Sequence, residues 1–291
     1  MQTIKNDFLE VSVTEKGGTL TSIVDKTTNT QLLWQGAEDS WTGQDVVIFP
    51  FVGRMQDGWY TVDGKRYDMP IHGLCEGATF EVRELTADKV VLGLRYSADT
   101  LVCYPFKFDF EVTRQVVGRT LTTTMRVVNL DDKTIYFGMG GHPAMALPCK
   151  AGSERDDLSG NYLDFGREYS PHNLSLYEGK YILGKEQFGK VSQIQLTKEL
   201  MDQYPTVLLC DDFPRVFDLV RADGVRVTFD ITTAPILGLW SWENKGGYYC
   251  IEPWLATPDC QPVTRELQDK PYILSLGSGK QYEYTFSMTI R

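Results

Sequence analysis

The chain has 291 residues and a formal net charge of −10, from 39 acidic and 29 basic side chains. Binding to nucleic acid depends on clustered lysine and arginine that displace phosphate counterions, and the sequence contains no such cluster. Hydrophobic residues make up 42% of the chain and aromatic residues 12%, which is enough for a large core and excludes extensive disorder. We therefore expect a folded protein that has no nucleic-acid partner.

No segment has the features of a membrane span or a secretory leader. The first seven residues contain no apolar run of signal-peptide length, and the longest apolar stretch, Val46–Val52, includes a proline and is too short to cross a bilayer. Six cysteines are scattered without a C-x-x-C pair, so neither a zinc knuckle nor a thiol redox motif is indicated. The sequence predicts a cytoplasmic protein with reduced cysteines and no membrane partner.

Apolar and polar residues alternate with a period of two in several parts of the chain, which is typical of half-buried β-strands. The alternation predicts strands over 89–96, 106–112, 121–128, 225–231 and 282–290. Turn signals separate such runs: Gly17-Gly18, Asp63-Gly64, Val117-Gly118, Asp223-Gly224 and Gly246-Gly247. The best helical candidate covers residues 197–203, where Thr197 would cap a short helix. Because no linker or low-complexity stretch interrupts the pattern, we predict one domain over residues 1–291, an antiparallel sandwich or barrel with very little helix.

Acid–base residues are few, and their positions are informative. The chain has three histidines, of which His72 in Ile-His-Gly and His142 in Gly-Gly-His-Pro lie in loops expected between strands. Glu252, in Ile-Glu-Pro-Trp, lies at an expected strand end. A fold that joins Glu252 to these histidines would exchange protons near neutral pH without a cofactor. His172 lies in a polar stretch and is expected at the surface.

Two other interpretations of these residues remain open. Glu252 is also compatible with an ordinary surface or salt-bridged carboxylate at the end of a strand, and a histidine in a tight turn is often a structural hydrogen-bonding group. In addition, His72, His142 and Glu252 have the composition of a two-histidine, one-carboxylate metal site. Against a metal, the three residues come from separate loops and lack a close His-x-His pair.

Five short segments, taken in order, resemble the aldose 1-epimerase (galactose mutarotase) family. They are FPFVGR at 49–54, DGK at 63–65, IHG at 71–73, GHPA at 141–144 and IEPW at 251–254. Their order and approximate spacing match that family over nearly the whole chain, and the Gly-Gly-His-Pro and Glu-Pro-Trp forms resemble its LacX-like subgroup. The resemblance implies a large antiparallel β-sandwich, the galactose mutarotase-like supersandwich, with a sugar cleft across its concave face.

The resemblance also implies a reaction and two catalytic residues. Members of this family interconvert the α and β anomers of a free sugar by opening and closing its ring, which requires one base and one acid and no cofactor or metal. Glu252 corresponds to the general base, and apolar neighbours such as Trp254 are expected to raise the pKa of its carboxyl. His142 corresponds to the general acid that donates a proton to the ring oxygen.

Further residues are expected to hold the sugar. His72 and Arg54 would bind its oxygens, Arg54 through the several donors of its guanidinium. A carboxylate is also expected in the segment Cys-Asp-Asp-Phe-Pro, where we choose Asp212 and keep Asp211 as the alternative. From sequence alone, a turn between strands explains this segment equally well.

Substrate class is the last inference from the sequence. Relatives that act on hexose 6-phosphates carry an arginine shortly after the first His-Gly, whereas this chain has Glu76 there, and a carboxylate repels phosphate. We therefore expect a neutral hexose as the small-molecule substrate. The alternatives are a non-catalytic protein that binds or senses carbohydrate on the same fold, and a hexose-phosphate mutarotase. The sequence does not distinguish a monomer from a homodimer.

Overall fold

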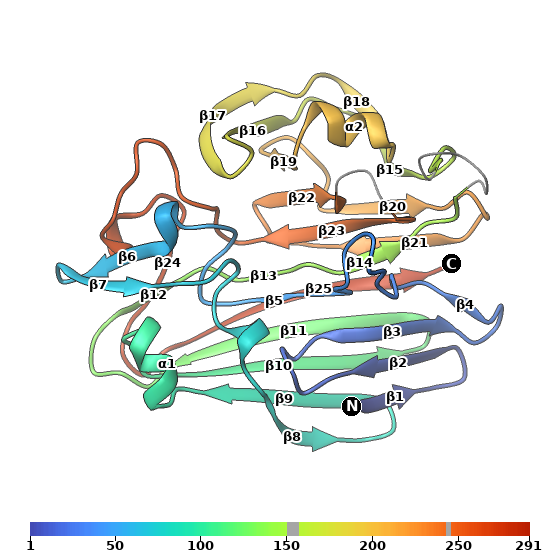
Figure 1. Ribbon diagram of the computed structural model, residues 1–291. Helices are drawn as coiled ribbons and strands as arrows, with labels where there is room; N and C mark the ends of the chain where they lie inside the picture. Colours follow the sequence, from blue (N-terminus) through green and yellow to red (C-terminus); the bar gives the residue numbers. More distant parts are fainter. Residues whose placement is uncertain (150–156, 243–245) are drawn as a thin grey trace.

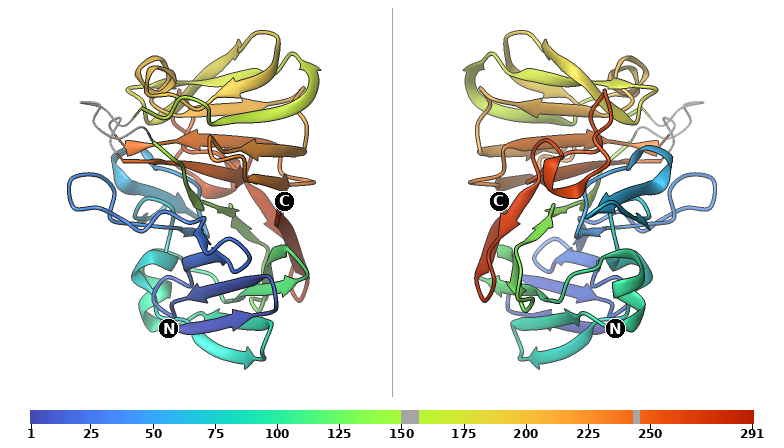
Figure 2. Two further views of the ribbon diagram at one scale, coloured as in Figure 1. Left: turned by 90° about the vertical axis from the view of Figure 1, so that its right-hand side faces the viewer. Right: turned by 90° about the vertical axis from the view of Figure 1, so that its left-hand side faces the viewer.

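Two large antiparallel sheets dominate the computed structural model, which describes residues 1–149, 157–242 and 246–291 (Figures 1 and 2). The nine-stranded sheet has, in spatial order, β18 (Val191–Gln195), β15 (Tyr162–Tyr169), β20 (Val216–Val220), β21 (Arg226–Asp230), β25 (Gln281–Ile290), β11 (Thr120–Asn129), β10 (Phe108–Val117), β9 (Lys89–Arg95) and β8 (Glu81–Leu85). The eight-stranded sheet has β17 (Tyr181–Gln187), β16 (His172–Tyr177), β19 (Val207–Cys210), β22 (Ile236–Trp240), β23 (Tyr248–Trp254), β13 (Gly140–Gly141) and β5 (Val47–Ile48), with β14 (Ala144–Ala146) also paired to β23.

Smaller elements complete the fold. A four-stranded sheet contains β1 (Gln2–Lys5), β2 (Leu9–Val13), β3 (Leu20–Asp25) and β4 (Thr30–Gln31). Two further pairs are β6 (Trp59–Val62) with β7 (Lys65–Asp68) and β12 (Ile135–Phe137) with β24 (Leu274–Leu276). The helices of the described ranges are short: α1 (Ala98–Cys103) and α2 (Lys198–Gln203) have six residues each. None of them is long and apolar enough to cross a membrane.

The fold class predicted from alternation is confirmed: the protein is an all-β, antiparallel sandwich with very little helix. Each predicted strand corresponds to an observed one, namely β9, β10, β11, β21 and β25. In β10 and β11 buried and half-buried residues alternate almost throughout, so one face of each strand packs in the core. The predicted cap is also present, because the Thr197 side chain accepts a hydrogen bond from the Leu200 amide at the start of α2. Helix α1, which the sequence analysis did not single out, begins with a capping box between Ser97 and Thr100.

The last strand, β25, lies in the middle of the nine-stranded sheet. It pairs with β11 on one side and β21 on the other, so it joins strands from the first and second halves of the chain (Figure 1). Its partners are distant in sequence: Thr124 and Thr285, which are 161 residues apart, form a side-chain hydrogen bond of 2.9 Å. The two halves therefore share one continuous sheet.

The central strands of the eight-stranded sheet are buried on both faces. In β23 the odd-numbered Tyr249 and Ile251 belong to the main hydrophobic core, whereas Tyr248, Cys250 and Trp254 belong to smaller clusters on the opposite face. The neighbouring strand β22 behaves in the same way, with Leu237 and Leu239 in the main core. Since side chains alternate across a strand, Glu252 projects to the same face as Cys250 and Trp254. This second face carries the candidate site.

Candidate active site

Glu252 is fixed near the end of β23 by strand pairing on both sides. Its direct neighbour on β22 is Gly238, and a Cβ atom added there would lie only 3.1 Å from the Glu252 Cβ. The absence of a side chain at Gly238 thus leaves space beside the carboxylate. The Glu252 side chain is 1% exposed, and the polar groups next to its carboxyl are the His142 imidazole and the Trp254 indole.

His142 reaches Glu252 because the two glycines before it allow close packing. A Cβ added to Gly140 would lie 2.7 Å from the Pro253 carbonyl oxygen, and one added to Gly141 would lie 2.7 Å from the Phe286 ring. Such contacts are too short for any other residue. Strand β13 therefore lies directly against β23 and β25, and the His142 imidazole follows it at the level of Glu252.

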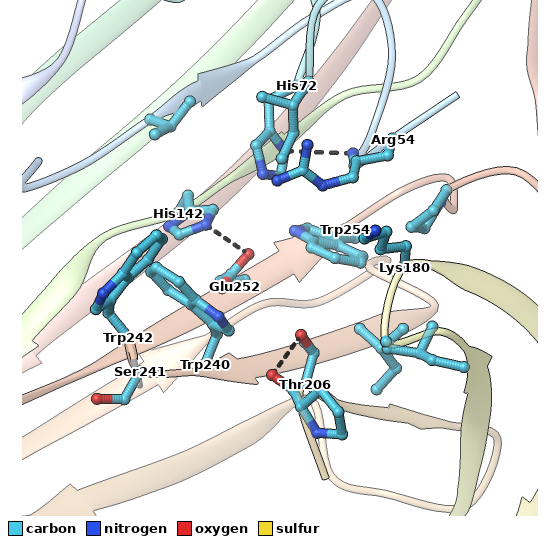
Figure 3. A pocket seen from close by; sticks show the side chains of 18 of the residues that line it. Arg54, His72, His142, Lys180, Thr206, Trp240, Ser241, Trp242, Glu252 and Trp254 are labelled. Atoms are coloured by element: carbon cyan, nitrogen blue, oxygen red, sulfur yellow. Dashed lines mark hydrogen bonds and ion pairs between the residues drawn. The ribbon is translucent and has the colours of Figure 1, made fainter. Parts of the chain in front are cut away.

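His142 and Glu252 form a buried pair, with Nε2 of the histidine 3.2 Å from Oε2 of the glutamate (Figure 3). Burial raises the pKa of the Glu252 carboxyl well above 4.5, and the nearby Trp254 indole only partly opposes the rise. Burial also lowers the pKa of His142 to about 4. Both shifts have the same cause, since a low-dielectric site disfavours each charged form. Burial therefore favours the neutral form of each member of the pair.

His72 is the second histidine of the site, and it lies in a strained loop. Its φ angle of +59° is rare for a residue other than glycine, and such strain persists where the surrounding structure enforces it. The Gly53 amide donates to His72 Nδ1 at 3.3 Å, which leaves Nε2 as the nitrogen that carries the proton. The His72 ring centroid is 5.1 Å from that of His142. Burial lowers the pKa of His72 well below 6.5, and the charges of His142 and Arg54 lower it further.

These residues line one cavity of about 780 Å³ (Figure 3). Four tryptophans contribute to its walls: Trp41, Trp240, Trp242 and Trp254. Trp41 and Trp240 also contact the His142 ring, at centroid distances of 5.4 and 5.8 Å. A cavity of this size with aromatic walls and a few convergent polar groups is typical of a small-molecule site.

Four of the five predicted site residues lie in this cavity: Arg54, His72, His142 and Glu252. Asp212 does not line the cavity. The Asp212 carboxylate accepts a hydrogen bond from the Ser170 amide at 2.9 Å. The alternative, Asp211, pairs with Lys185 at 2.9 Å and with His172 at 3.0 Å, so this segment is a structural turn.

Other cavity residues were not identified from the sequence. Lys180 comes from the turn between β16 and β17, Thr206 from the loop before β19, and Trp240 and Trp242 from the end of β22 and just beyond it. The Trp-Ser-Trp spacing was a usable signal, because period-two alternation places both indoles on the same side of an extended chain. Lys180 and Thr206 carried no such signal.

The comparisons with known proteins show the family to which this chain belongs. The family model for aldose 1-epimerase matches residues 1–289, so the chain belongs to the aldose 1-epimerase family. The LacX-like resemblance is also confirmed. The chromosomal protein LacX of Lactococcus lactis subsp. lactis is 27% identical over 300 residues, which cover 97% of this chain and 98% of that protein.

Solved structures with the same architecture include two from lactobacilli. The galactose mutarotase related enzyme from Lactobacillus acidophilus superposes with a TM-score of 0.91 at 28% identity, covering 100% of this chain and 97% of that one. A galactose mutarotase-like protein from Lactobacillus casei has the same TM-score at 24% identity, with 100% of both chains covered. At this lower identity the likeness shows the fold alone.

Proposed function

We propose that the protein is a cofactor-independent aldose 1-epimerase that interconverts the anomers of a neutral hexose. The observation that carries this proposal is the pair formed by His142 and Glu252, buried at 3.2 Å from one another in the wall of an aromatic cavity. Glu252 acts as the general base and His142 as the general acid. His72 and Arg54, which line the same cavity, bind sugar oxygens.

The proton held by the pair is the one that the reaction needs. Transfer of this proton from Glu252 to His142 gives a carboxylate and an imidazolium, and sugar hydroxyls that donate to the carboxylate stabilise this charged form. The carboxylate then takes the proton of the C1 hydroxyl while the imidazolium protonates the ring oxygen, and the bond between C1 and the ring oxygen breaks. Rotation about C1–C2 and closure by the reverse proton transfers give the other anomer.

The charges around the cavity support a neutral substrate. Glu76 and Glu178 line it together with Arg54 and Lys180, so two carboxylates oppose two cations. A phosphate would meet repulsion from both glutamates, whereas the faces of the tryptophans suit the apolar face of a pyranose.

Hexose-phosphate mutarotase is the second candidate, and one observation favours it. No ion pair of Arg54 or Lys180 is seen within the described residues, and both side chains are exposed at the cavity. Comparing kcat/KM for glucose and glucose 6-phosphate separates the two candidates. We expect glucose to be the better substrate, and we expect Glu76→Gln to raise kcat/KM for glucose 6-phosphate only. A wild-type preference for the phosphate ester would reverse the assignment.

Polarimetry on freshly dissolved α-glucose and α-galactose tests the proposed activity. Wild type should shorten the approach to anomeric equilibrium, and Glu252→Gln should reduce kcat/KM by about 10²–10⁴-fold, the usual contribution of a general acid or base. Asp212→Asn, outside the cavity, is the matched control. Full activity of Glu252→Gln would show that Glu252 is not the general base. If calorimetry shows that wild type binds these sugars but polarimetry shows no faster mutarotation, the protein is a non-catalytic carbohydrate-binding protein.

A further inference from the structure

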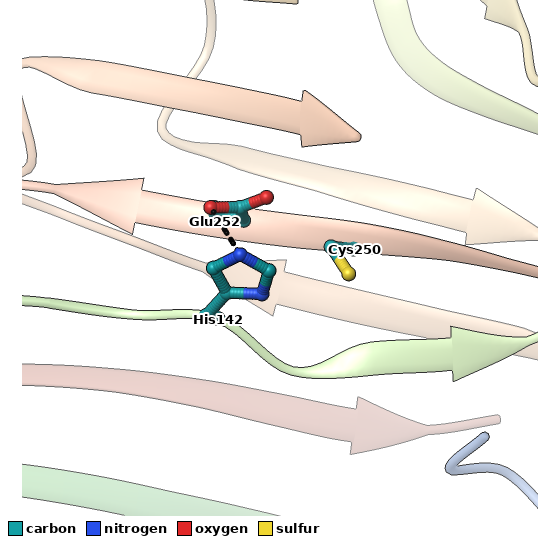
Figure 4. Close-up of side chains that lie close together, drawn as sticks. All are labelled: His142, Cys250 and Glu252. Carbon is teal, nitrogen blue, oxygen red and sulfur yellow. Dashed lines mark ion pairs between the residues drawn. The ribbon is translucent and has the colours of Figure 1, made fainter. Parts of the chain in front are cut away.

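Cys250 lies beside the proposed acid–base pair and has no part in its chemistry. It precedes Glu252 by two residues in β23, so both side chains project to the same face. One donor atom each from His142, Cys250 and Glu252 lie within 4.8 Å of one another, and all three residues are buried (Figure 4). The pair found by sequence analysis is thus part of a compact group of nitrogen, sulfur and oxygen donors.

Two members of this group have few polar partners. Nδ1 of His142 makes no hydrogen bond within the described residues, and the buried Glu252 carboxyl has only the His142 ring at 3.2 Å and the Trp254 indole beside it. Buried polar atoms without partners are costly, and in native proteins they commonly mark the place of a ligand. A sugar satisfies the carboxylate and the imidazole, but it gains little from a thiol. A ligand that uses all three donors must therefore be of another kind.

We propose that His142, Cys250 and Glu252 bind a thiophilic divalent cation, with Zn²⁺ as the best match, in place of the sugar. Zinc accepts mixed thiolate, imidazole and carboxylate ligands, and three protein ligands leave its fourth position open to water or another small ligand. With bonds of about 2.0–2.3 Å, the ligand atoms of a tetrahedral site are about 3.5 Å apart, so the three side chains must close by about 1 Å. This set differs in one member from the metal alternative weighed in the sequence analysis, with Cys250 in place of His72.

The charge balance of this site suits a buried position. The cation displaces the thiol proton of Cys250 and the single proton shared by His142 and Glu252. One thiolate and one carboxylate then balance the two positive charges of the metal, so the loaded site is neutral. No oxidation or reduction is involved.

Binding of the cation blocks the proposed reaction, because the metal occupies the same two groups that exchange protons with the sugar. The inference about inhibition therefore rests on the proposed function, whereas the inference about metal binding does not. Zinc and sugar should exclude one another, and removal of zinc by a chelator should restore the anomerase activity in full.

Direct metal titration tests the site without reference to activity. Metal-free wild type is titrated with Co²⁺, whose thiolate charge-transfer absorption reports a Cys ligand, and with Zn²⁺ by calorimetry. We expect one equivalent to bind, and Cys250→Ala and Cys250→Ser to lose the absorption band and to weaken Zn²⁺ binding by at least about tenfold. Cys103→Ala is the matched control, because this half-buried thiol lies in α1 outside the cavity and should leave the titration unchanged. A persistent band in folded Cys250 variants, or no band in wild type, overturns the metal site.

A second measurement tests the exclusion of sugar. One equivalent of Zn²⁺ should abolish mutarotation by wild type and leave Cys250→Ala active, and EDTA should restore the wild-type rate. Activation by Zn²⁺, or equal inhibition of wild type and Cys250→Ala, contradicts the proposal. If no mutarotation is found under any condition, the cobalt titration still decides whether the metal binds, so the two proposals fail separately.

Discussion

Glu252 and Asp45 are both buried carboxylates, but their partners differ. Oδ2 of Asp45 accepts a hydrogen bond from the Leu20 amide at 3.0 Å and another from the Arg114 guanidinium at 3.2 Å. Arg114 is itself 1% exposed, so the two charges neutralise one another inside the protein. Glu252 has no cationic partner among the described residues; its carboxyl lies 3.2 Å from the His142 ring and beside the Trp254 indole. The first carboxylate is satisfied by the fold, and the second is left for a ligand.

A third buried carboxylate, Asp259, follows the pattern of Asp45. One of its oxygens accepts a hydrogen bond from the Gln56 amide at 2.8 Å, and the other pairs with the buried ammonium of Lys270. Burial alone therefore does not identify a functional carboxylate in this protein. The informative property is burial without a donor that neutralises the charge.

The largest expected effect is a difference in stability between Asp45→Asn and Glu252→Gln. Removing one member of a buried ion pair leaves the other charge unpaired, so Asp45→Asn should lower the free energy of unfolding by about 3–5 kcal/mol. Glu252→Gln removes a carboxyl that has no such partner, so it should not lower the free energy of unfolding. Urea denaturation at pH 8 measures both variants. Equal losses in the two would show that Glu252 is also a structural residue.

The same comparison predicts how the stability difference changes with pH. Because the pKa of Glu252 is raised on folding, wild type loses stability as the pH rises from 4.5 through the folded pKa, where the buried carboxyl must ionise. Gln cannot ionise, so the stability of Glu252→Gln relative to wild type should increase with pH. Denaturation series at several pH values above 4.5 measure the trend, and a constant difference would contradict the raised pKa.

A smaller effect is expected in the pH profile of activity. The reaction needs one exchangeable proton on the pair. Below the His142 pKa of about 4 the pair takes up a second proton, and above the raised pKa of Glu252 it loses the first. The value of kcat/KM should therefore stay level from about pH 5 upward until Glu252 begins to ionise, and it should fall above the raised pKa of that carboxyl. Initial rates corrected for the spontaneous reaction measure the profile. A decline that begins near pH 6.5 would instead indicate an ordinary, solvated histidine.

The smallest effect is expected outside the cavity, at Asp212. Its hydrogen bond to the Ser170 amide supports a surface turn, so Asp212→Asn should change kcat/KM by about twofold or less. The contrasting variant is Arg54→Gln, which removes a cation that lines the cavity and should raise KM for the sugar. A loss of activity in Asp212→Asn as large as in Arg54→Gln would return this carboxylate to the site.

Much of the fold was predictable because it depends on local patterns. Two-residue alternation located β9, β10, β11, β21 and β25, and Thr197 identified α2. The extension of the domain over the whole chain stays a prediction. The strand order was not predictable, since pairing between β25 and both β11 and β21 depends on contacts far apart in sequence.

The site was predictable only in part, for a related reason. His142 and Glu252 stood out because histidines are few and both lie in family-like segments. Asp212 lies outside the cavity, and the sequence could not show this because an Asp-Asp turn looks the same whether it faces a ligand or solvent. Cys250 lies beside the acid–base pair because of sheet pairing, and Lys180 reaches the cavity from a hairpin turn. Neither arrangement has a recognisable signal in the local sequence.

The central position of β25 has a consequence for biosynthesis. Residues 281–290 fill the gap between β21 and β11, so the nine-stranded sheet cannot close until this segment has been synthesised. Before that point β11 and β21 present unpaired edges, which are prone to join other chains. Contacts over such separations also make folding slow. Partly folded chains in which β25 has not yet paired therefore expose two strand edges that are open to association with other chains.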